Sequence, residues 1–334
     1  MTPADKPSVS VLGAGNMGTA LGHVLAGNGH DVRLWSIEED VLEDVRDNRR
    51  NSKYLKHIEL SERIQSAWKL EEAAGGAGIV LFSVTSQVLR AVARDVAPHL
   101  PAGCIVLNVA KGLEEGSDLR LSRVLGEELG DGRPMVCMGG PAMASQFAAG
   151  VPTAVIVGSD DPEAAKAVQQ AFQNEFFKVE TTDDLVGVEL CATLKNAYAI
   201  ALGICDGMGL AMNTKSLLVP LALSEMASLV EALGGRRQTA YGLAGLGDLI
   251  TTGFSADGRN RRLGETMGSG GDWREFMKGP TLEGVPACHS ARGLAHKHGV
   301  ETPLLDVIYT VLCGEQEPRE AMQSFLREFD YNGR

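Results

Sequence analysis

Short apolar runs alternate with amphipathic segments through the first half of the chain. The apolar runs contain few polar residues and are too short for helices, which is typical of strands buried on both faces of a parallel sheet. We predict such strands at 8–12, 31–35, 79–84, 104–109, 135–138 and 153–157, with helices at 19–26 and 87–96 between them. This alternation predicts an α/β fold in which helices cover both faces of a mostly parallel sheet.

The second half has a different pattern, because the strand-like runs stop after about residue 182. Helices are expected from 190–202 onward toward Asp206, from about Thr214 to Leu233, and over 288–298. Pro220 is expected to bend the second of these helices. The chain therefore divides into an α/β domain over 1–182 and an all-α domain over 183–334.

A glycine motif, Gly-x-Gly-x-x-Gly, follows the first predicted strand directly and opens the first predicted helix. Gly13 allows the tight turn, Gly15 lets a pyrophosphate approach the backbone, and Gly18 lets the helix pack on the strand. The amides at the helix N-terminus then face the phosphates. Inside a strand–helix–strand unit this motif predicts a Rossmann-type domain that binds NAD or NADP.

The end of the second predicted strand bears on the choice of nucleotide. An acidic residue there usually binds the ribose 2′-hydroxyl of NAD, but in this chain Trp35 and Ser36 occupy the place. Glu38 and Glu39 lie close enough to keep NAD open. Arg49 and Arg50 could contact a 2′-phosphate or be solvated. The missing acid favours NADP over NAD.

Two residues of the first half fall where a substrate is expected. In open α/β sheets, ligands bind outside the carboxyl ends of the strands, and both Lys111 and Gly140 follow predicted strands. Lys111 could reach a phosphate or a carbonyl there. A solvated loop lysine is the equally weighted alternative.

One lysine stands alone in the most apolar helix of the second half. The segment 190–202 is apolar on nearly every side, which is typical of a helix buried within a domain, and Lys195 is its one charge. No carboxylate lies one turn away on the same helix. The alternatives to a functional role are that Lys195 reaches the surface along its own stem or pairs with an acid from elsewhere. Burying an unpaired ammonium is costly, and desolvation favours its neutral form, which suits proton transfer. Since Asn196 follows directly, we interpret Lys195 as a functional residue.

Two charged motifs follow further along. Asp248 lies after a glycine-rich run and four residues before Thr252, so both side chains share one face of a helix. Asp248 is either a helix N-cap or the group that holds the buried lysine. At the next predicted helix start, Arg259 and Asn260 suit a phosphate, because arginine binds it bidentately and a helix N-terminus adds N–H donors. The two arginines that follow are expected to be solvated, Arg261 and Arg262.

Composition narrows the ligand class and the compartment. The 334 residues carry a formal net charge of −12, which argues against nucleic acid or an anionic membrane surface as a partner. The six cysteines lie scattered without metal-ligand spacing, so no metal is expected and buried free thiols in a reducing compartment are favoured. The first residues lack the layout of a signal peptide, and no apolar run approaches the length that spans a bilayer. We therefore expect a cytoplasmic protein that binds an anionic small molecule in a local basic pocket.

Taken together, these segments closely resemble the bacterial glycerol-3-phosphate dehydrogenases that use NAD or NADP, over nearly the whole chain. The motifs that carry the resemblance are residues 13–21, 110–114, 195–196, 242–249 and 255–264. The resemblance implies reversible hydride transfer between a nicotinamide and dihydroxyacetone phosphate, giving sn-glycerol 3-phosphate for phospholipid synthesis.

The resemblance also implies a role for each matching residue. Lys195 matches the proton donor and acceptor of the family, with Lys111 and Asp248 as further catalytic residues. Substrate contacts are implied for Lys111, Gly140, Ala142, Lys195, Asp248, Gly258, Arg259 and Asn260. Cofactor contacts are implied for Gly13, Gly15, Asn16, Met17, Gly18, Trp35, Lys111, Ala144, Arg259, Thr281 and Glu283.

Some positions depart from the family pattern, and other functions stay open. Ala142 and Gly258 stand where the family usually has a hydroxyl side chain, which bears on substrate affinity rather than on reaction type. One alternative is a related two-domain 2-oxo or β-hydroxy acid reductase, although several of those place an Asn where this chain has Ala199. Another is a non-catalytic NAD(P)-binding sensor. Helical second domains of this kind often pair, so a homodimer is the assembly to test.

Overall fold

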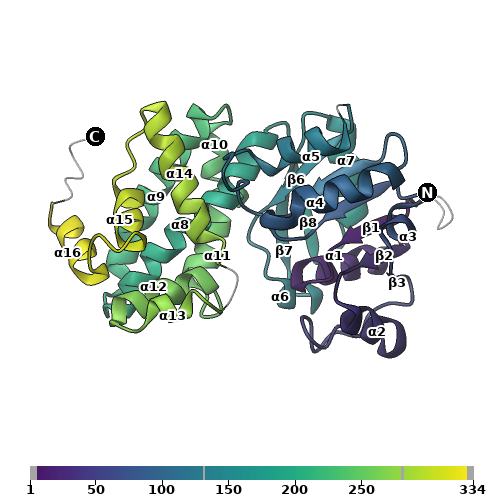
Figure 1. Ribbon diagram of the computed structural model, residues 1–334, viewed down its shortest axis with the longest axis horizontal. Coiled ribbons are helices and arrows are strands. Elements are labelled where there is room, and N and C mark those ends of the chain that lie inside the picture. Colours follow the sequence, from purple (N-terminus) through teal and green to yellow (C-terminus); the bar gives the residue numbers. More distant parts are fainter. Residues whose placement is uncertain (1–5, 131, 280–281, 329–334) are drawn as a thin grey trace. The chain divides into compact units, whose positions relative to one another are not determined.

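The computed structural model describes residues 6–130, 132–279 and 282–328. The chain forms two compact units, Met1–Glu189 and Leu190–Arg334, and each is described by itself. The first is built on a sheet and the second on helices (Figure 1).

The sheet of the first unit has eight strands in the described part of the chain, in the order β3-β2-β1-β4-β5-β6-β7-β8. The strands are β1 Val9–Leu12, β2 Val32–Trp35, β3 Ile64–Ala67, β4 Ile79–Phe82, β5 Ile105–Asn108, β6 Met135–Gly139, β7 Thr153–Gly158 and β8 Phe177–Thr182. Neighbouring strands pair in parallel, except that β6 and β7 are antiparallel. The expected α/β fold with a mostly parallel sheet is confirmed.

The hydrophobic pattern does not predict β3 and β8, which form the two edges of the sheet. β3 reads Ile-Gln-Ser-Ala and β8 reads Phe-Lys-Val-Glu-Thr-Thr, and both mix buried with exposed side chains. An edge strand is buried on fewer sides than a central one, so it lacks the continuous apolar run that marks the inner strands.

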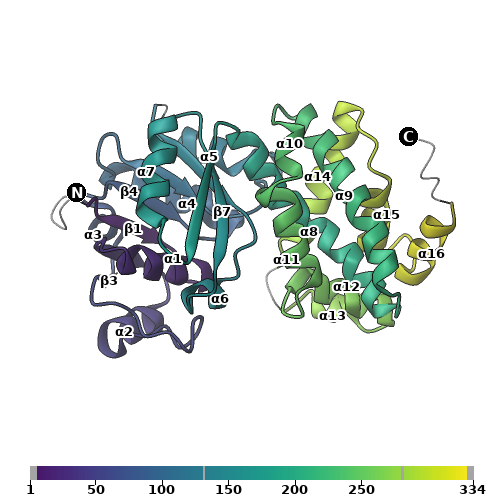
Figure 2. The ribbon, with the colours of Figure 1, turned by 180° about the vertical axis from the view of Figure 1, so that it is seen from behind.

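Alternate residues of each strand face opposite sides of the sheet, and each side has its own hydrophobic core. Val9, Val11 and Leu81 belong to one core, and Leu12 and Phe82 to the other. Helices α1 (Asn16–Gly27), α2 (Glu39–Asn48), α6 (Ala144–Ala148) and α7 (Pro162–Phe172) cover the first side. Helices α3 (Leu70–Ala74), α4 (Ser86–Val96) and α5 (Leu121–Leu129) cover the second. Figure 1 shows α4 in front of the sheet, and Figure 2, from behind, shows α7 in front.

The secondary structure in the described residues of the second unit consists of helices joined by turns and loops. Its helices are α8 Leu185–Gly207 (from Leu190 on), α9 Met212–Ala232, α10 Arg237–Ala240, α11 Asp248–Phe254, α12 Arg259–Ser269, α13 Trp273–Phe276, α14 Gly284–His298, α15 Pro303–Leu312 and α16 Pro318–Glu328. A π-helical turn, Leu243–Gly247, runs directly into α11. Pro220 lies inside α9, as expected.

Helix α8 is the core of this unit. Its side chains from Leu190 to Cys205 are buried almost without exception, which explains why the sequence is apolar on every side. By length and composition α8 could also cross a bilayer, so the expectation that no run approaches such a length is corrected. Because 94% of its apolar window is buried inside the protein, α8 has the character of a core helix.

Glycines bring α8 and α12 into direct backbone contact. A Cβ at Gly203 would lie 2.0 Å from the Arg261 carbonyl oxygen, and a Cβ at Gly264 would lie 2.0 Å from the Ile200 carbonyl oxygen. Gly207 repeats this contact one turn further along α8. The close approach holds the first turn of α12 beside the middle of α8, where Lys195 and Asn196 lie.

A buried carboxylate connects α9 to α15 and to α8. Glu225 of α9 is 2% exposed and accepts hydrogen bonds from the Leu304 and Leu305 N–H groups at 2.7 and 3.1 Å. These N–H groups lie in the first turn of α15, which otherwise has no carbonyl partner for them. The Tyr198 hydroxyl of α8 donates to the same carboxylate at 3.1 Å.

Candidate functional site

The glycine motif forms a tight turn between β1 and α1. Gly13 has φ +113°, and its N–H donates to the Trp35 carbonyl oxygen at 2.9 Å. A Cβ at Gly18 would lie 2.0 Å from the Gly13 carbonyl oxygen, whereas a Cβ at Gly15 would meet nothing within 4 Å. Gly13 and Gly18 are therefore required by the turn itself, and Gly15 faces open space. No side chain caps the N-terminus of α1, so this turn fits a dinucleotide pyrophosphate.

Asn51 holds this turn from behind. Its side chain is fully buried, and its amide nitrogen donates to the Ala14 carbonyl oxygen and to Thr19 Oγ1, both at 2.8 Å. Its Oδ1 accepts from the Tyr54 N–H at 3.2 Å. The sequence around Asn51 does not mark it as a site residue, because its neighbours are basic and polar and indicate a surface segment.

The end of β2 carries charges of both signs. The Trp35 side chain is buried in the core, so only its backbone reaches the turn. Glu38 forms an ion pair with Lys53 and accepts from the Tyr54 hydroxyl at 2.8 Å. Arg49, in the left-handed conformation, lies 3.8 Å from Glu62 in an exposed ion pair, which is weak enough to leave its guanidinium available to a ligand. The preference for NADP stays a prediction.

A pocket of the first unit brings predicted site residues together. Met17, Lys111, Gly140 and Ala142 line it, with an apolar wall made by Leu21, Val109, Met138 and Val155. Gly140 has φ +127°, and a Cβ there would lie 3.1 Å from Val155 Cα. Lys111 follows β5 and Gly140 follows β6, so both lie at carboxyl ends of parallel strands, where a ligand is expected. Ala144, the first residue of α6, is buried.

Lys195 is the centre of a second group, within the helical unit. Its ammonium lies 2.9 Å from Asp248 Oδ1, and the two side chains are only 5% and 4% exposed. It also donates to Thr252 Oγ1, and the Thr252 hydroxyl donates to Asp248 Oδ1 at 3.3 Å. The expectation of a buried lysine is confirmed. Of the alternatives that stayed open, the structure shows the pairing with an acid from elsewhere in the chain, Asp248. Thr252 is absent from the predicted site, although its spacing from Asp248 was the available signal.

A chain of amide hydrogen bonds runs beside this pair. The Gly284 N–H donates to Asn260 Oδ1 at 3.0 Å, and the Asn260 amide donates to Asn196 Oδ1 at 3.1 Å. The Asn196 amide in turn donates to Glu283 Oε2 at 3.3 Å. Helices α8, α12 and α14 are thus tied together next to Lys195, and Glu283 lies in this group.

The arginines at the start of α12 differ from one another. Arg259 is exposed, and the hydrogen bonds and ion pairs of the described residues do not include its guanidinium. Arg261, expected to be solvated, is 9% exposed and pairs with Asp206 and with Glu265, because the close contact of α8 and α12 buries its stem. That expectation is wrong for Arg261 and correct for Arg262, which is exposed. A Cβ at Gly258 would lie 2.6 Å from the Thr252 carbonyl oxygen, so a side chain there would disturb α11.

The predicted site residues therefore form two groups, one in each unit. Thr281 lies outside the described residues. Among the residues that are described, no group of His, Cys, Asp or Glu could hold a metal ion. Five cysteines are buried free thiols, and the sixth, Cys313, is exposed.

Known proteins resemble this chain over both of the segments that contain these groups of residues. Family models described as the N-terminus and the C-terminus of NAD-dependent glycerol-3-phosphate dehydrogenase match residues 8–165 and 184–323. A curated glycerol-3-phosphate dehydrogenase, NAD(P)+, of Clostridium perfringens strain SM101 is 38% identical over 324 residues, 96% of this chain and 97% of that protein. The enzyme of the same name from Moorella thermoacetica is 42% identical over 309 residues, 92% of each chain. The crystal structure of glycerol-3-phosphate dehydrogenase from Coxiella burnetii superposes with a TM-score of 0.91 at 36% identity, covering 97% of this chain and 99% of that one.

Proposed function

The chain belongs to the NAD-dependent glycerol-3-phosphate dehydrogenase family, and from this premise we propose that Lys195 is the proton donor in the reduction of dihydroxyacetone phosphate. The enzyme is an NAD(P)-dependent oxidoreductase that acts on a CH–OH group. Its product in this direction is sn-glycerol 3-phosphate. The observation that carries the proposal is the nearly inaccessible ammonium held by Asp248 and Thr252.

A ketone that accepts a hydride develops negative charge on its oxygen, and an ammonium can stabilise that charge and then give up a proton. When bound, the reduced nicotinamide supplies the hydride. Asp248 pairs with the Lys195 ammonium and fixes its direction, while Thr252 accepts a second hydrogen bond from it. In the oxidation direction the neutral amine of Lys195 accepts the proton of the substrate hydroxyl.

Arg259 and Asn260 are proposed to bind the phosphate of the substrate. Arg259 stands at the N-terminus of α12, where the helix adds positive potential, and its exposed guanidinium has the fork that matches phosphate oxygens. Asn260 is 7% exposed and already holds Asn196, so it sets the position of the residue next to Lys195. A fixed phosphate orients the carbonyl for transfer.

The glycine turn and the pocket beside it are proposed to hold the nucleotide and part of the substrate. Gly15 and the N-terminus of α1 would hold the pyrophosphate, and Met17, Lys111, Gly140 and Ala144 would complete the binding surface. Ala142 offers a methyl group where a hydroxyl is usual, so one substrate hydrogen bond is lost. NADP selection is assigned to Arg49: Arg49→Ala is expected to lower kcat/KM with NADPH several-fold and leave that with NADH unchanged.

The wider setting is proposed from chemistry. The free thiols suit a reducing, cytoplasmic compartment, and sn-glycerol 3-phosphate made there supplies glycerophospholipid synthesis. A homodimer is the expected assembly, and light scattering of the purified chain measures it.

The test follows the absorbance of NADH and NADPH as the purified chain reduces dihydroxyacetone phosphate, with a 2-oxo acid as the competing substrate. Turnover of the phosphorylated ketone with at least one nucleotide supports the proposal. A folded chain that binds nucleotide and reduces neither compound is the non-catalytic sensor. A chain that prefers the 2-oxo acid is the alternative reductase.

A further inference from the structure

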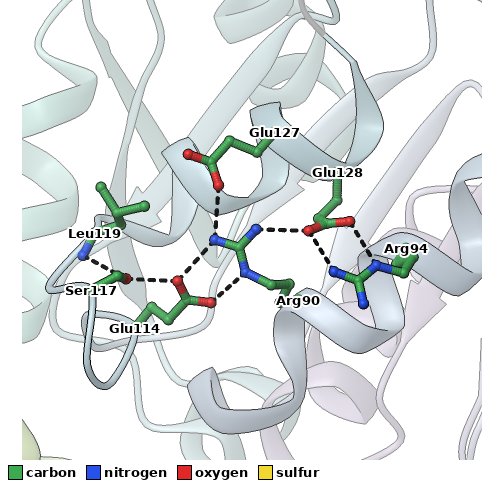
Figure 3. Close-up of polar contacts among 7 residues, drawn as sticks. All are labelled: Arg90, Arg94, Glu114, Ser117, Leu119, Glu127 and Glu128. Atoms are coloured by element: carbon green, nitrogen blue, oxygen red, sulfur yellow. Dashed lines mark hydrogen bonds and ion pairs between the residues drawn. The ribbon is translucent and has the colours of Figure 1, made fainter.

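The loop that carries Lys111 is attached to the rest of the first unit through an arginine of α4. Glu114 lies three residues after Lys111, and its carboxylate takes two hydrogen bonds from Arg90, from Nε at 2.6 Å and from a terminal nitrogen at 2.8 Å (Figure 3). This is the bidentate arrangement that fixes both distance and direction. The hydrogen bonds from Arg90 and, second, from Ser117 hold the pKa of Glu114 at about 2, so its carboxylate is charged throughout the range in which enzymes work.

The arginine is fixed independently of the loop. Its guanidinium also donates to Glu127 at 2.8 Å and to Glu128 at 2.7 Å, both on α5. Arg94, one turn further along α4, pairs with Glu128 as well (Figure 3). Two helices of the core therefore hold Arg90 in place, and Glu114 is the point at which the loop attaches to it.

Contacts on both sides of Lys111 fix the backbone of the loop. Before it, Asn108 Oδ1 accepts from the Ala110 N–H at 3.0 Å. After it, Gly112 has φ +126°, and a Cβ there would lie 3.1 Å from Ser86 Oγ at the start of α4. Ser86 and Arg90 are one turn apart, so a single face of α4 contacts the loop at two points. Ser117 donates to the Glu114 carboxylate at 2.7 Å, which closes the segment that follows.

We propose that Arg90 and Glu114 are positioning residues that hold the Lys111 loop in the conformation in which Lys111 acts. Neither side chain lines the pocket in which Lys111 lies, so both act through the backbone between Gly112 and Glu114. The inference rests on the proposed function insofar as Lys111 contacts the substrate. A displacement of about 1 Å at such a contact costs on the order of 10²-fold in rate, so loss of the attachment is expected to lower kcat/KM roughly 10–100-fold.

The test uses Glu114→Gln, which keeps the shape of the side chain and removes its charge. It is expected to lower kcat/KM for dihydroxyacetone phosphate and to leave the Kd for NADH within about 2-fold, because the glycine turn is unchanged. Arg90→Lys keeps the charge but loses the planar guanidinium that makes the bidentate pair, so its kcat/KM for dihydroxyacetone phosphate is expected to be lowered as well. Arg94→Met is the matched control: it removes an arginine of the same helix that does not contact Glu114, and is expected to stay within about 2-fold of wild type.

A second measurement separates positioning from general stability. In a Lys111→Met background, adding Glu114→Gln is expected to change kcat/KM less than about 2-fold, because the group being positioned is already gone. A further full loss in the double variant overturns the proposal, as does a Glu114→Gln enzyme with unchanged kcat/KM.

Amide hydrogen exchange of the whole chain gives a readout that needs no turnover. Exchange over residues 109–116 is expected to be at least about 10-fold faster in Glu114→Gln than in wild type and unchanged in Arg94→Met. Unchanged exchange in Glu114→Gln overturns the inference whatever the activity. A wild-type chain that does not turn over dihydroxyacetone phosphate counts against the proposed function, while the exchange result still decides whether Glu114 holds the loop.

Discussion

Replacing Asp248 with asparagine tests the buried pair at the centre of the helical unit. The amide has nearly the shape of the carboxylate, so the change removes a charge and little else. Lys195 and Asp248 are both about 5% exposed and lie 2.9 Å apart, so little water can screen the ammonium that is left behind. Removing one partner of such a pair costs about 3–5 kcal/mol.

The lower end of that range is expected for Asp248→Asn, because the amide oxygen can still accept one hydrogen bond from Lys195 or Thr252. A loss of about 3 kcal/mol lowers the melting temperature by roughly 6–12 °C for a unit of this size. The rate of reduction is expected to fall at least about 10²-fold, since the proton donor loses the carboxylate that fixes its position.

Thermal unfolding followed by circular dichroism and initial rates at saturating nucleotide measure the two effects. Asp257→Asn is the control, because it makes the same chemical change at an exposed position of the neighbouring loop. A variant Asp248→Asn that melts within about 2 °C of wild type refutes the buried pair. One that is destabilised yet turns over at the wild-type rate refutes the role of Asp248 in catalysis.

Three further outcomes are expected. Arg259→Met should raise KM for dihydroxyacetone phosphate about 10-fold or more and leave the Kd for NADH unchanged if Arg259 serves the phosphate alone, whereas a KM equal to wild type rejects it as a phosphate ligand. Glu225→Ala should lower the free energy of unfolding by about 3 kcal/mol, since it leaves two N–H groups of α15 and the Tyr198 hydroxyl without their acceptor. Glu231→Ala, at an exposed position of the same helix, should be near neutral. Equal melting temperatures of the two variants would contradict this prediction. The pKa of Glu114 is lowered from 4.5 to about 2, so its pairing stabilises the fold above about pH 4.5 and is lost as the pH falls toward 2. The difference in melting temperature between wild type and Glu114→Gln should therefore shrink across that interval, and a constant difference would reject the ion pair.

The inner strands and the glycine turn could be predicted from the sequence, because burial on both faces and a fixed backbone conformation each leave a local signature. The edge strands β3 and β8 could not, since each mixes buried side chains with side chains that face solvent. Lys195 was predictable as one charge in an apolar helix. Its pairing with Asp248 was only one of two readings, because the two residues lie far apart in the sequence.

Contacts between segments that are far apart in the sequence could not be predicted from the sequence. Arg261 is buried because glycines of α8 and α12 let the two backbones touch, a fact that no window of sequence around Arg261 contains. Asn51 is buried by the turn that it supports, although its neighbours are charged. Thr252 had the right spacing from Asp248 and lacked only the evidence that Lys195 lies on the same side.

The measurement that tests the central claim most directly is the turnover of Lys195→Met combined with Asp248→Asn. The double variant leaves no unpaired buried charge, so it is expected to recover most of the stability that either single change removes. We predict that it binds NADH with a Kd within about 2-fold of wild type and reduces dihydroxyacetone phosphate at least about 10³-fold more slowly. A folded double variant that still turns over within about 10-fold of wild type would contradict the assignment of Lys195 as the proton donor.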